Sequence, residues 1–297
     1  MGREFMPIRL MENFRALFYA PYYATQALGF YAQEGVEIEL KTSDNPGDAV
    51  PLLLDGRIDL TWGGPMRVMI AHDRDPNSPL VNFGEVVSRD PFFLIGKRKP
   101  FKLADLTQLR FTSVSEVPTP WMCLQNDLRD AGMDPDSIKR ISNRTMADNY
   151  AALRNGEIDV MQAFEPFVSM AERDGAGEVL YAASARGLTV YTAFIASRDG
   201  VAKYRGQFAA MTRAIARMLQ WIATHSPEEF AEVAAPYFPQ TPKDLLARSL
   251  GRYRDAGLWA REPAMSREGF DRLGRCFVSG GSLKRAPNFE ACIEQSL

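Results

Sequence analysis

Cysteine and histidine are scarce in this chain, and their scarcity excludes several kinds of site. Among 297 residues there are three cysteines and two histidines, and no pair of cysteines has CxxC spacing. Zinc and iron–sulfur sites need clusters of sulfur and nitrogen ligands, so we expect neither a metal nor another cofactor. A disulfide between Cys276 and Cys292 would need Cα atoms within about 7 Å. The sequence leaves that pairing open, with free buried thiols as the simpler expectation.

An excess of charge and long apolar runs are also absent. The formal net charge is −2, so no basic excess favours binding to a phosphate backbone or an anionic membrane. No stretch approaches the roughly 18 consecutive apolar residues of a membrane-spanning helix. With 46% hydrophobic and 24% charged residues, the composition is that of a globular protein large enough for two domains. We therefore expect neither a nucleic-acid partner nor a membrane-spanning segment.

The N-terminal segment has no continuous apolar stretch either. Met1 to Glu12 mixes charged residues with short apolar runs, which does not match a secretory signal. Residues 2–5 (GREF) resemble a vector-derived extension ahead of a native start at Met6. Cytoplasmic and periplasmic locations both stay open, because a signal removed ahead of Met6 would leave no trace in the sequence.

One segment of the chain occurs twice. Residues 53–60 (LLDGRIDL) reappear as residues 153–160 (LRNGEIDV), and a proline follows each copy, Pro65 or Pro166. Each copy is typical of a helix end, a glycine that turns the chain at positive φ, and a short apolar strand with one acidic residue. The repeat predicts two similar α/β lobes, and the space between such lobes is where small ligands bind.

The order of elements predicts how the chain divides between the lobes. A charged connector with turn residues at 96–100 marks the first crossing, and the β-rich segment 190–196 marks the return. We expect lobe 1 to begin with residues 1–95, lobe 2 to span 96–190, and residues 191–297 to return to lobe 1. Two crossings favour a hinge over a flexible tether.

The C-terminal third has helical periodicity. Met211, Ile215, Met218 and Ile222 recur at three- and four-residue steps, as the buried face of a helix requires. We expect this region to be mostly helical and to pack on lobe 1. Further helix starts are predicted near Pro227, Pro242 and Ser266.

Several of these motifs, taken in order, carry a family resemblance. Residues 20–24 (APYYA) precede 27–38 (ALGFYAQEGVEI), and the repeated G-x-I-D is followed by an aromatic-Glu-Pro turn at 164–167 (FEPF). Over most of residues 8–200 the chain resembles the nitrate/sulfonate/taurine and thiamine-pyrimidine group of solute-binding proteins. There a helix ending in G-[YF]-[FY]-x-x-E-G precedes an extended V-E-I strand. The resemblance implies a type II periplasmic-binding-protein fold, which clamps a ligand between two lobes and usually serves an ABC transporter permease.

The strand ends predict where a ligand lies. In open α/β sheets the binding crevice lies beyond the C-terminal ends of the strands, so the residues just after each predicted strand are candidates. In this sequence the candidate ligand contacts at those ends are Asn13, Phe14, Arg15, Phe18, Tyr19, Tyr22, Asp44, Trp62, Gly63, Gly64, Ser113, Ser115, Glu116, Gln162, Glu165 and Tyr191.

Each chemical type among these candidates has a functional and a structural interpretation. The aromatic residues can stack on a planar ring or simply form core. The Gly63–Gly64 turn and the loop 113–119 can present backbone N–H groups to an anion at a helix N-terminus, although turn geometry alone explains both. Arg15 and Arg67 can pair with an acidic ligand group, yet surface arginines are common.

Acidic residues carry a similar ambiguity. Glu165 can accept from ligand N–H groups or cap the helix that follows it. Asp59 and Asp159 mark the repeat, and we expect them to bond local backbone and fix strand geometry. A catalytic role for His72 is not expected, because it lies in a polar turn.

Three functions are compatible with these patterns. The first is a solute-binding protein for a small aromatic, heterocyclic or anionic molecule such as a pyrimidine or a sulfonate. The second is a cytosolic enzyme on the same fold, as in the thiamine-pyrimidine and menaquinone routes. The sequence lacks the cysteine-rich cluster of the pyrimidine synthase, and no carboxylate or histidine pair is compelling for acid–base catalysis. The third, a sensor domain, lacks an appended signalling module. The sequence therefore favours the binding protein.

Overall fold

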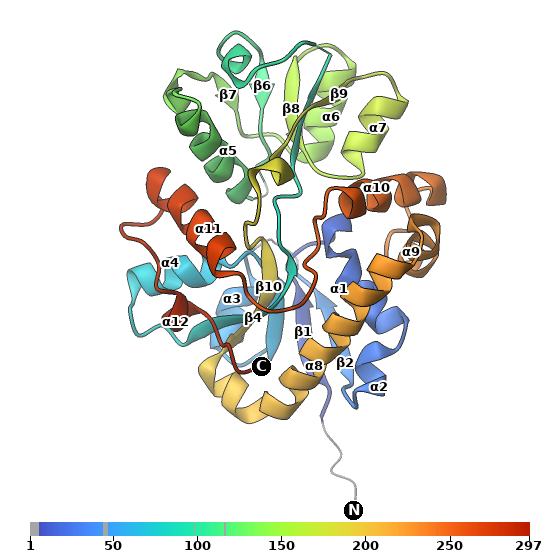
Figure 1. Cartoon of the computed structure of the whole chain (residues 1–297), viewed down its shortest axis with the longest axis vertical. Helices are drawn as coiled ribbons and strands as arrows, with labels where there is room; N and C mark the ends of the chain where they lie inside the picture. Colours follow the sequence, from blue (N-terminus) through green and yellow to red (C-terminus); the bar gives the residue numbers. More distant parts are fainter. Residues whose placement is uncertain (1–5, 44–46, 98, 116) are drawn as a thin grey trace, which may run out of the picture.

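Two five-stranded sheets form two lobes, one above the other in Figure 1. This computed structural model describes residues 6–43, 47–97, 99–115 and 117–297. Lobe 1 contains the sheet β2-β1-β3-β10-β4 and lobe 2 the sheet β7-β6-β8-β5-β9. The strands are β1 Ile8–Glu12, β2 Ile38–Thr42, β3 Leu60–Gly63, β4 Leu80–Val87, β5 Phe93–Gly96, β6 Phe111–Thr112, β7 Arg140–Ile141, β8 Val160–Ala163, β9 Glu178–Ala182 and β10 Thr192–Ser197.

The two sheets have equivalent pairing. In each, the second strand pairs in parallel with both neighbours, β1 with β2 and β3, and β6 with β7 and β8. The fourth strand is antiparallel to its neighbours in both cases, β10 in lobe 1 and β5 in lobe 2. That fourth strand is the one delivered by the chain crossing from the other lobe, so each lobe completes its sheet with a strand from the hinge.

Helices cover the sheets and continue beyond the second crossing. They are α1 Ala20–Ala27, α2 Phe30–Gln33, α3 Ala49–Leu54, α4 Met66–Arg74, α5 Thr119–Asp130, α6 Met146–Arg154, α7 Phe167–Arg173, α8 Arg198–Thr224, α9 Pro227–Ala234, α10 Lys243–Asp255, α11 Arg267–Ser279 and α12 Phe289–Cys292. The predicted helix starts at Pro227 and Ser266 are confirmed, since Ser226 and Ser266 cap α9 and α11. None of the helices in the described ranges is long and apolar enough to cross a membrane.

The first crossing occurs earlier in the chain than the sequence predicts. We expected lobe 1 to extend to residue 95, but β5 pairs with β8 and β9 of lobe 2. The chain therefore crosses between Val87 and Phe93. The apolar run at Phe93–Gly96 has the composition of a buried strand, and composition alone does not tell in which sheet such a strand is buried.

The repeated segment makes the same contact in both lobes. Asp59 accepts hydrogen bonds from the backbone N–H of Arg9 and from its guanidinium, at 3.0, 2.9 and 2.7 Å. Asp159 accepts the same three bonds from Arg110, at 2.8, 2.9 and 2.7 Å. Both acidic residues fix strand pairing, as the sequence predicts.

The C-terminal helices contact both lobes, which the sequence did not predict. α8 packs on α1, α2 and β4 of lobe 1, as expected, whereas α10 also contacts α7 and α11 also contacts α5 of lobe 2. In Figure 1 these two helices lie on opposite sides of the junction between the lobes. The periodicity of a helix predicts that one face is buried but not against which element.

The three cysteines are buried and free. Cys276 and Cys292 therefore do not form the disulfide that the sequence left open.

A buried carboxyl group, Glu85 on β4, accepts a hydrogen bond from the backbone N–H of Ser266 at 2.9 Å, which ties the start of α11 to the sheet of lobe 1. Burial raises the pKa of the Glu85 carboxyl to about 8, and the bond from Ser266 opposes that rise.

Replacing the two repeat aspartates tests their structural role. Asp59→Ala should lower the free energy of unfolding by about 1–3 kcal/mol, because Arg9 loses its acceptor at a nearly buried position. Asp159→Ala should cost less, since its side chain is 33% exposed and that of Arg110 56% exposed. Urea unfolding of both variants measures the difference. Equal losses would contradict this account.

Glu85→Gln tests the buried carboxyl. The folded state raises the pKa of Glu85 above its unfolded value near 4.3, so the carboxyl stabilises the folded protein less as pH rises between about 4 and 8. Glutamine keeps an acceptor for Ser266 and does not ionise. The free energy of unfolding of the variant, relative to that of the wild type, should increase by roughly 1 kcal/mol or more from pH 5 to pH 8. Urea titrations at both pH values measure this gain, and a constant difference would argue against it.

Candidate functional site

A small cavity lies between the lobes where the strand ends meet. Its volume is about 30 Å³, comparable with the share of one water molecule in the liquid and far below the 300–1,000 Å³ or so of typical ligand sites. An organic ligand can enter only if the lobes separate or side chains rotate. The cavity is lined by Asn13, Phe14, Phe18, Tyr19, Gly64, Met66, Arg67, Phe92, Val117, Pro118, Thr119 and Tyr191.

Arg67 gives this cavity a positive charge. It stands in the first turn of α4, and one Nη donates to the side-chain oxygen of Asn13 at 3.3 Å. The backbone N–H of Gly47 donates to the same oxygen at 3.0 Å. Burial lowers the pKa of the Arg67 guanidinium, but arginine still stays charged at any physiological pH. Within the described ranges no carboxylate forms an ion pair with Arg67, and none lines the cavity.

Two phenols add neutral donors to the same cavity. Burial raises the pKa of both Tyr19 and Tyr191, so both keep their hydroxyl protons. The hydroxyl of Tyr191 is buried and has no hydrogen-bond partner among the described residues. A buried donor without a partner is costly, so a ligand oxygen bound there would remove that cost.

Two helix N-termini point at the cavity from opposite lobes. Gly64 and Met66 line it at the start of α4, and Pro118 and Thr119 line it at the start of α5. Helix N-termini carry partial positive charge and unpaired N–H groups, which favour an anion. The cavity therefore combines a guanidinium, phenol hydroxyls and two positive helix ends.

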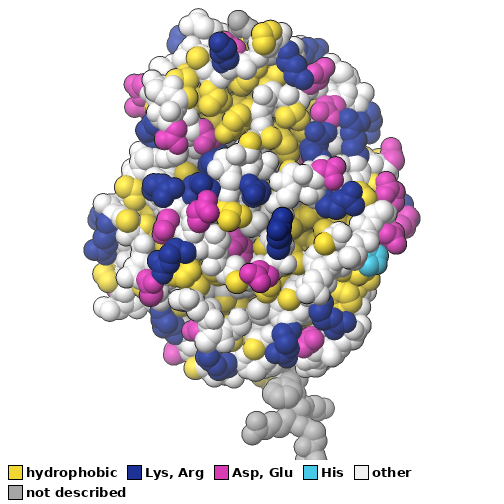
Figure 2. Space-filling model, viewed as in Figure 1, with side chains coloured by type: hydrophobic (Ala, Val, Ile, Leu, Met, Phe, Trp, Pro, Cys, Tyr) yellow, Lys and Arg dark blue, Asp and Glu magenta, His cyan; other side chains and the backbone are white. Residues whose placement is uncertain are grey.

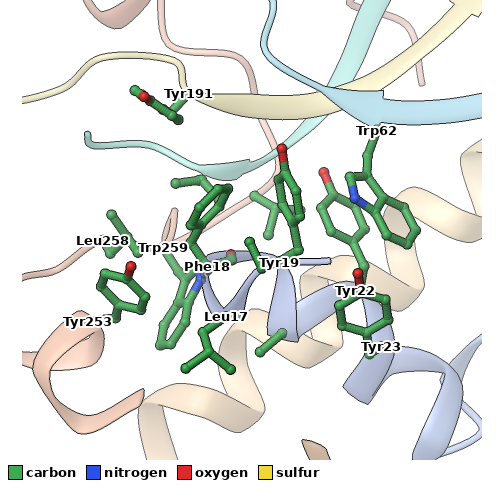
Figure 3. Close-up of a cluster of buried hydrophobic side chains, with 14 of the residues drawn as sticks. Leu17, Phe18, Tyr19, Tyr22, Tyr23, Trp62, Tyr191, Tyr253, Leu258 and Trp259 are labelled. Carbon is green, nitrogen blue, oxygen red and sulfur yellow. Dashed lines mark hydrogen bonds between the residues drawn. The ribbon is translucent and has the colours of Figure 1, made fainter. Parts of the chain in front are cut away.

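The remaining walls are aromatic. Phe18 makes edge-on contacts with Phe14, Phe164 and Tyr191, with ring centroids 6.0, 5.6 and 6.4 Å apart. Phe92, on the first crossing, contacts Phe164 and Tyr191. Figure 3 shows Phe18 and Tyr19 side by side, with Tyr191 facing them from the second crossing. These rings can surround the apolar part of a ligand.

A second, larger groove lies next to this cavity. It has a volume of about 370 Å³ and is lined from lobe 1 by residues 14–17, from lobe 2 by residues 145–147 and 164–167, and from the C-terminal region by Phe238 and Thr241. Phe14 lines both spaces. Phe14 is therefore the residue that the small cavity and the larger groove share.

Three expected contacts lie in the core behind the cavity. The rings of Tyr22 and Trp62 stack with centroids 4.5 Å apart and 5° between their planes, and Figure 3 shows this parallel pair. Gly63 is buried in β3 opposite Ala193. For these residues the structure supports the core interpretation. The buried rings of Tyr22 and Trp62 stabilise lobe 1 through the apolar surface that they remove from water.

Three further candidates bind other parts of the protein. The guanidinium of Arg15 bonds the buried carboxylate of Glu12. The hydroxyl of Ser113 accepts from Arg140 at 2.7 Å. The side-chain NH₂ of Gln162 donates to the backbone carbonyl of Pro120 at 2.9 Å. Gln162 therefore supports the first turn of α5 from beneath and does not line the cavity.

Glu165 caps a helix and joins the lobes. Its carboxylate accepts from the backbone N–H and hydroxyl of Ser169 at 2.9 and 2.8 Å, which caps α7. It also accepts from Ser249 at 3.2 Å and Arg252 at 2.7 Å, both on α10. Burial raises the pKa of Glu165, and these donors oppose that rise. The capping interpretation that the sequence left open is the one the structure shows.

The other expected residues fall into two groups. Ser115 lies in the loop that leads to Val117 and α5, whereas Asp44 and Glu116 lie outside the described residues. Of the lining residues, Met66 and Phe92 were missed, and Arg67, Val117, Pro118 and Thr119 were considered but were not among the expected contacts. Phe92 stands at the chain crossing, so a correctly placed crossing would have identified it. Met66 follows the Gly63–Gly64 turn and Pro65, a helix start that the sequence does show.

The histidines lie away from the cavity. His72 contacts the carbonyl of Leu80 at 2.9 Å, and His225 stacks on Trp221 with centroids 4.0 Å apart. Within the described ranges, no group of three or more His, Cys, Asp or Glu residues is placed to hold a metal ion. On the face in Figure 2, acidic and basic side chains are interspersed, so the positive cavity contrasts with a mixed surface.

Comparisons with known proteins agree with this architecture. The chain is 24% identical over 295 residues to "Putative binding protein YtlA" of Bacillus subtilis, covering 98% of this chain and 88% of that protein. It is 25% identical over 154 residues to the 4-amino-5-hydroxymethyl-2-methylpyrimidine phosphate synthase of Schizosaccharomyces pombe, covering 51% and 43%.

Solved structures share the fold. The alkanesulfonate-binding protein SsuA of Xanthomonas axonopodis, bound to MOPS, superposes with a TM-score of 0.76 at 15% identity, covering 99% of both chains. The sequence model of the family described as NMT1/THI5 like matches residues 18–229. This match covers most of lobe 1, all of lobe 2 and α8. The chain therefore belongs to the NMT1/THI5-like family.

Proposed function

We propose that this chain is a solute-binding protein that holds a small organic anion between its lobes and delivers it to an ABC transporter permease. The observation that carries the proposal is the convergence of donors on one aromatic cavity. Arg67, Tyr19, Tyr191 and the N-termini of α4 and α5 line it, Arg67 and Tyr19 interact electrostatically, and the described lining residues include no carboxylate. Such a site favours a negatively charged group over a cation or a neutral amine.

The ligand class follows from the two kinds of wall. Arg67 can hold a sulfonate, carboxylate or phosphate group with two parallel N–H···O bonds. Phe14, Phe18 and Phe92 can contact a ring or a short apolar chain. The relatives support this choice, since one is a binding protein by its name and another binds an alkanesulfonate.

An enzyme is the second candidate, because one relative is a pyrimidine phosphate synthase. The cavity gives it less support. Acid–base or nucleophilic catalysis needs a titratable group within hydrogen-bond reach of the substrate. The described lining residues offer only tyrosines whose pKa is raised and an arginine. Both histidines and the three cysteines lie elsewhere.

The test is a thermal-shift screen combined with substitution of Arg67. The panel contains aliphatic and aromatic sulfonates, aromatic carboxylates, pyrimidines and their phosphates. We expect the largest stabilisation from a ring compound with an anionic group. Arg67→Met should weaken its binding about 10- to 100-fold, the value of a charged hydrogen-bond pair, in calorimetric titrations.

Arg74→Met is the matched control, because Arg74 is exposed at the far end of the same helix. It should leave affinity unchanged. Mass spectrometry of the compound after incubation should find it unaltered. Equal affinity in the two variants would overturn the anion site, and turnover would favour the enzyme.

Phe14→Ala tests how ligand reaches the cavity. Because Phe14 lines both spaces, removing its ring should widen the passage between the cavity and the groove. Association should then become several-fold faster, as followed by stopped-flow tryptophan fluorescence. Phe167→Ala is the control, since Phe167 lines the groove but not the cavity. If both variants associate as wild type does, access depends on lobe separation alone.

A further inference from the structure

Two buried cysteines come from opposite sides of the lobe junction. Cys123 is on α5 of lobe 2 and Cys276 is on α11, and both side chains are fully buried. The two thiols lie in one buried hydrophobic cluster, and each alters the pKa of the other. The hydrophobic cluster around Cys276 is formed by lobe 1, the second crossing and the C-terminal helices, and Cys123 is its one fully buried member from lobe 2 among the described residues.

The two helices touch along several side chains around this pair. Arg129 on α5 donates to Ser279 on α11 at 3.4 Å, and Ser279 lies 3.5 Å from the side-chain oxygen of Asn126. The hydroxyl of Ser282, just after α11, contacts the sulfur of Met122 at 3.6 Å. The thiols therefore lie inside an interface that any opening of the lobes on this side must separate.

A buried ionic cluster stands next to the thiols. Arg186, just before the second crossing, binds Asp90 on the first crossing at 2.9 Å and Asp127 on α5 at 2.5 Å. The neighbouring Cys123 lowers the pKa of the Cys276 thiol, and Arg186 lowers it further, whereas burial and the two carboxylates raise it. Cys276 is thus the thiol that more readily becomes the nucleophilic thiolate.

We propose that Cys123 and Cys276 are a redox-sensitive pair whose oxidation to a disulfide ties lobe 2 to α11 and holds the lobes closed. Cys292, the third cysteine, lies in the same cluster but at the end of α12, away from the contact between α5 and α11. The pair differs from an ordinary buried disulfide site because one half comes from lobe 2 and the other from α11, which also packs on α4 of lobe 1. The bond would regulate opening of the cavity, and this role rests on the proposed binding function. Formation of the bond does not depend on that function.

The chemistry needs a small-molecule disulfide as oxidant. The Cys276 thiolate attacks one sulfur of the oxidant, the oxidant S–S bond breaks, and one thiolate leaves. The Cys123 thiol then loses its proton and attacks the Cys276 sulfur, which expels the second thiolate and forms the Cys123–Cys276 bond. The two protons go to the two expelled thiolates, and two electrons reduce the oxidant to two thiols. Because both cysteines are buried when the lobes are closed, the first step requires a partly open state.

The test uses the full-length protein and oxidised glutathione. Reduced protein is incubated with excess oxidant, remaining thiols are alkylated, and non-reduced peptides are mapped by mass spectrometry. We expect a Cys123–Cys276 crosslink in wild type, and its loss in Cys123→Ser and Cys276→Ser. Cys292→Ser is the matched control and should still form the crosslink. The crosslinked protein should unfold several degrees above its reduced form, since the bond closes a long loop.

Further measurements test whether the bond restricts opening of the lobes. Hydrogen exchange should slow in α5 and α11 of the oxidised protein relative to the reduced one, which reports restricted opening without any ligand. Three outcomes would contradict the proposed Cys123–Cys276 bond. These are a mixed disulfide as the final product, a Cys276–Cys292 link, and thiols that stay unmodified while those of the urea-unfolded protein react fully. A crosslink without slower exchange would overturn the lock. All of these readings are independent of whether the cavity binds an anion.

Discussion

One contact, made twice, is the constraint on which both lobes depend. In each lobe an aspartate at the start of one strand accepts hydrogen bonds from the backbone N–H and the guanidinium of an arginine at the start of the neighbouring strand. The pairs are Asp59 with Arg9 and Asp159 with Arg110. The contact sets the parallel register of the central strands. Because parallel strands end at the same edge of a sheet, their following loops meet at the crevice.

The crevice owes its character to what those loops bring together. Arg67 and two helix N-termini supply positive charge, buried phenols supply neutral donors, and phenylalanines from lobe 1 and the first crossing supply the aromatic walls. The lobes are held in this arrangement from both sides, by Glu165 with Arg252 at α10 and by the α5 contact with α11. Closure thus depends on groups outside the cavity, and these are the contacts that opening must break.

Much of the fold could be predicted, and a smaller part of the site. The duplicated segment predicted two α/β lobes, and helical periodicity predicted the C-terminal helices. Strand ends pointed to Asn13, Phe14, Phe18 and Tyr191, which do line the cavity. They also pointed to Trp62 and Tyr22, which stack in the core, because strand-end position does not distinguish a ring that faces the crevice from one that faces a helix.

By itself, the sequence determined which segments form helices and strands, that the acidic residues of the repeat are structural, and that the protein carries few cysteines and histidines. Only the tertiary structure decided that Phe93–Gly96 joins the second sheet, that Glu165 binds α10, and that Cys123 and Cys276 share one buried cluster. Local patterns depend on neighbours within a few residues. These three outcomes depend on segments tens of residues or more apart that meet only when the lobes pack together.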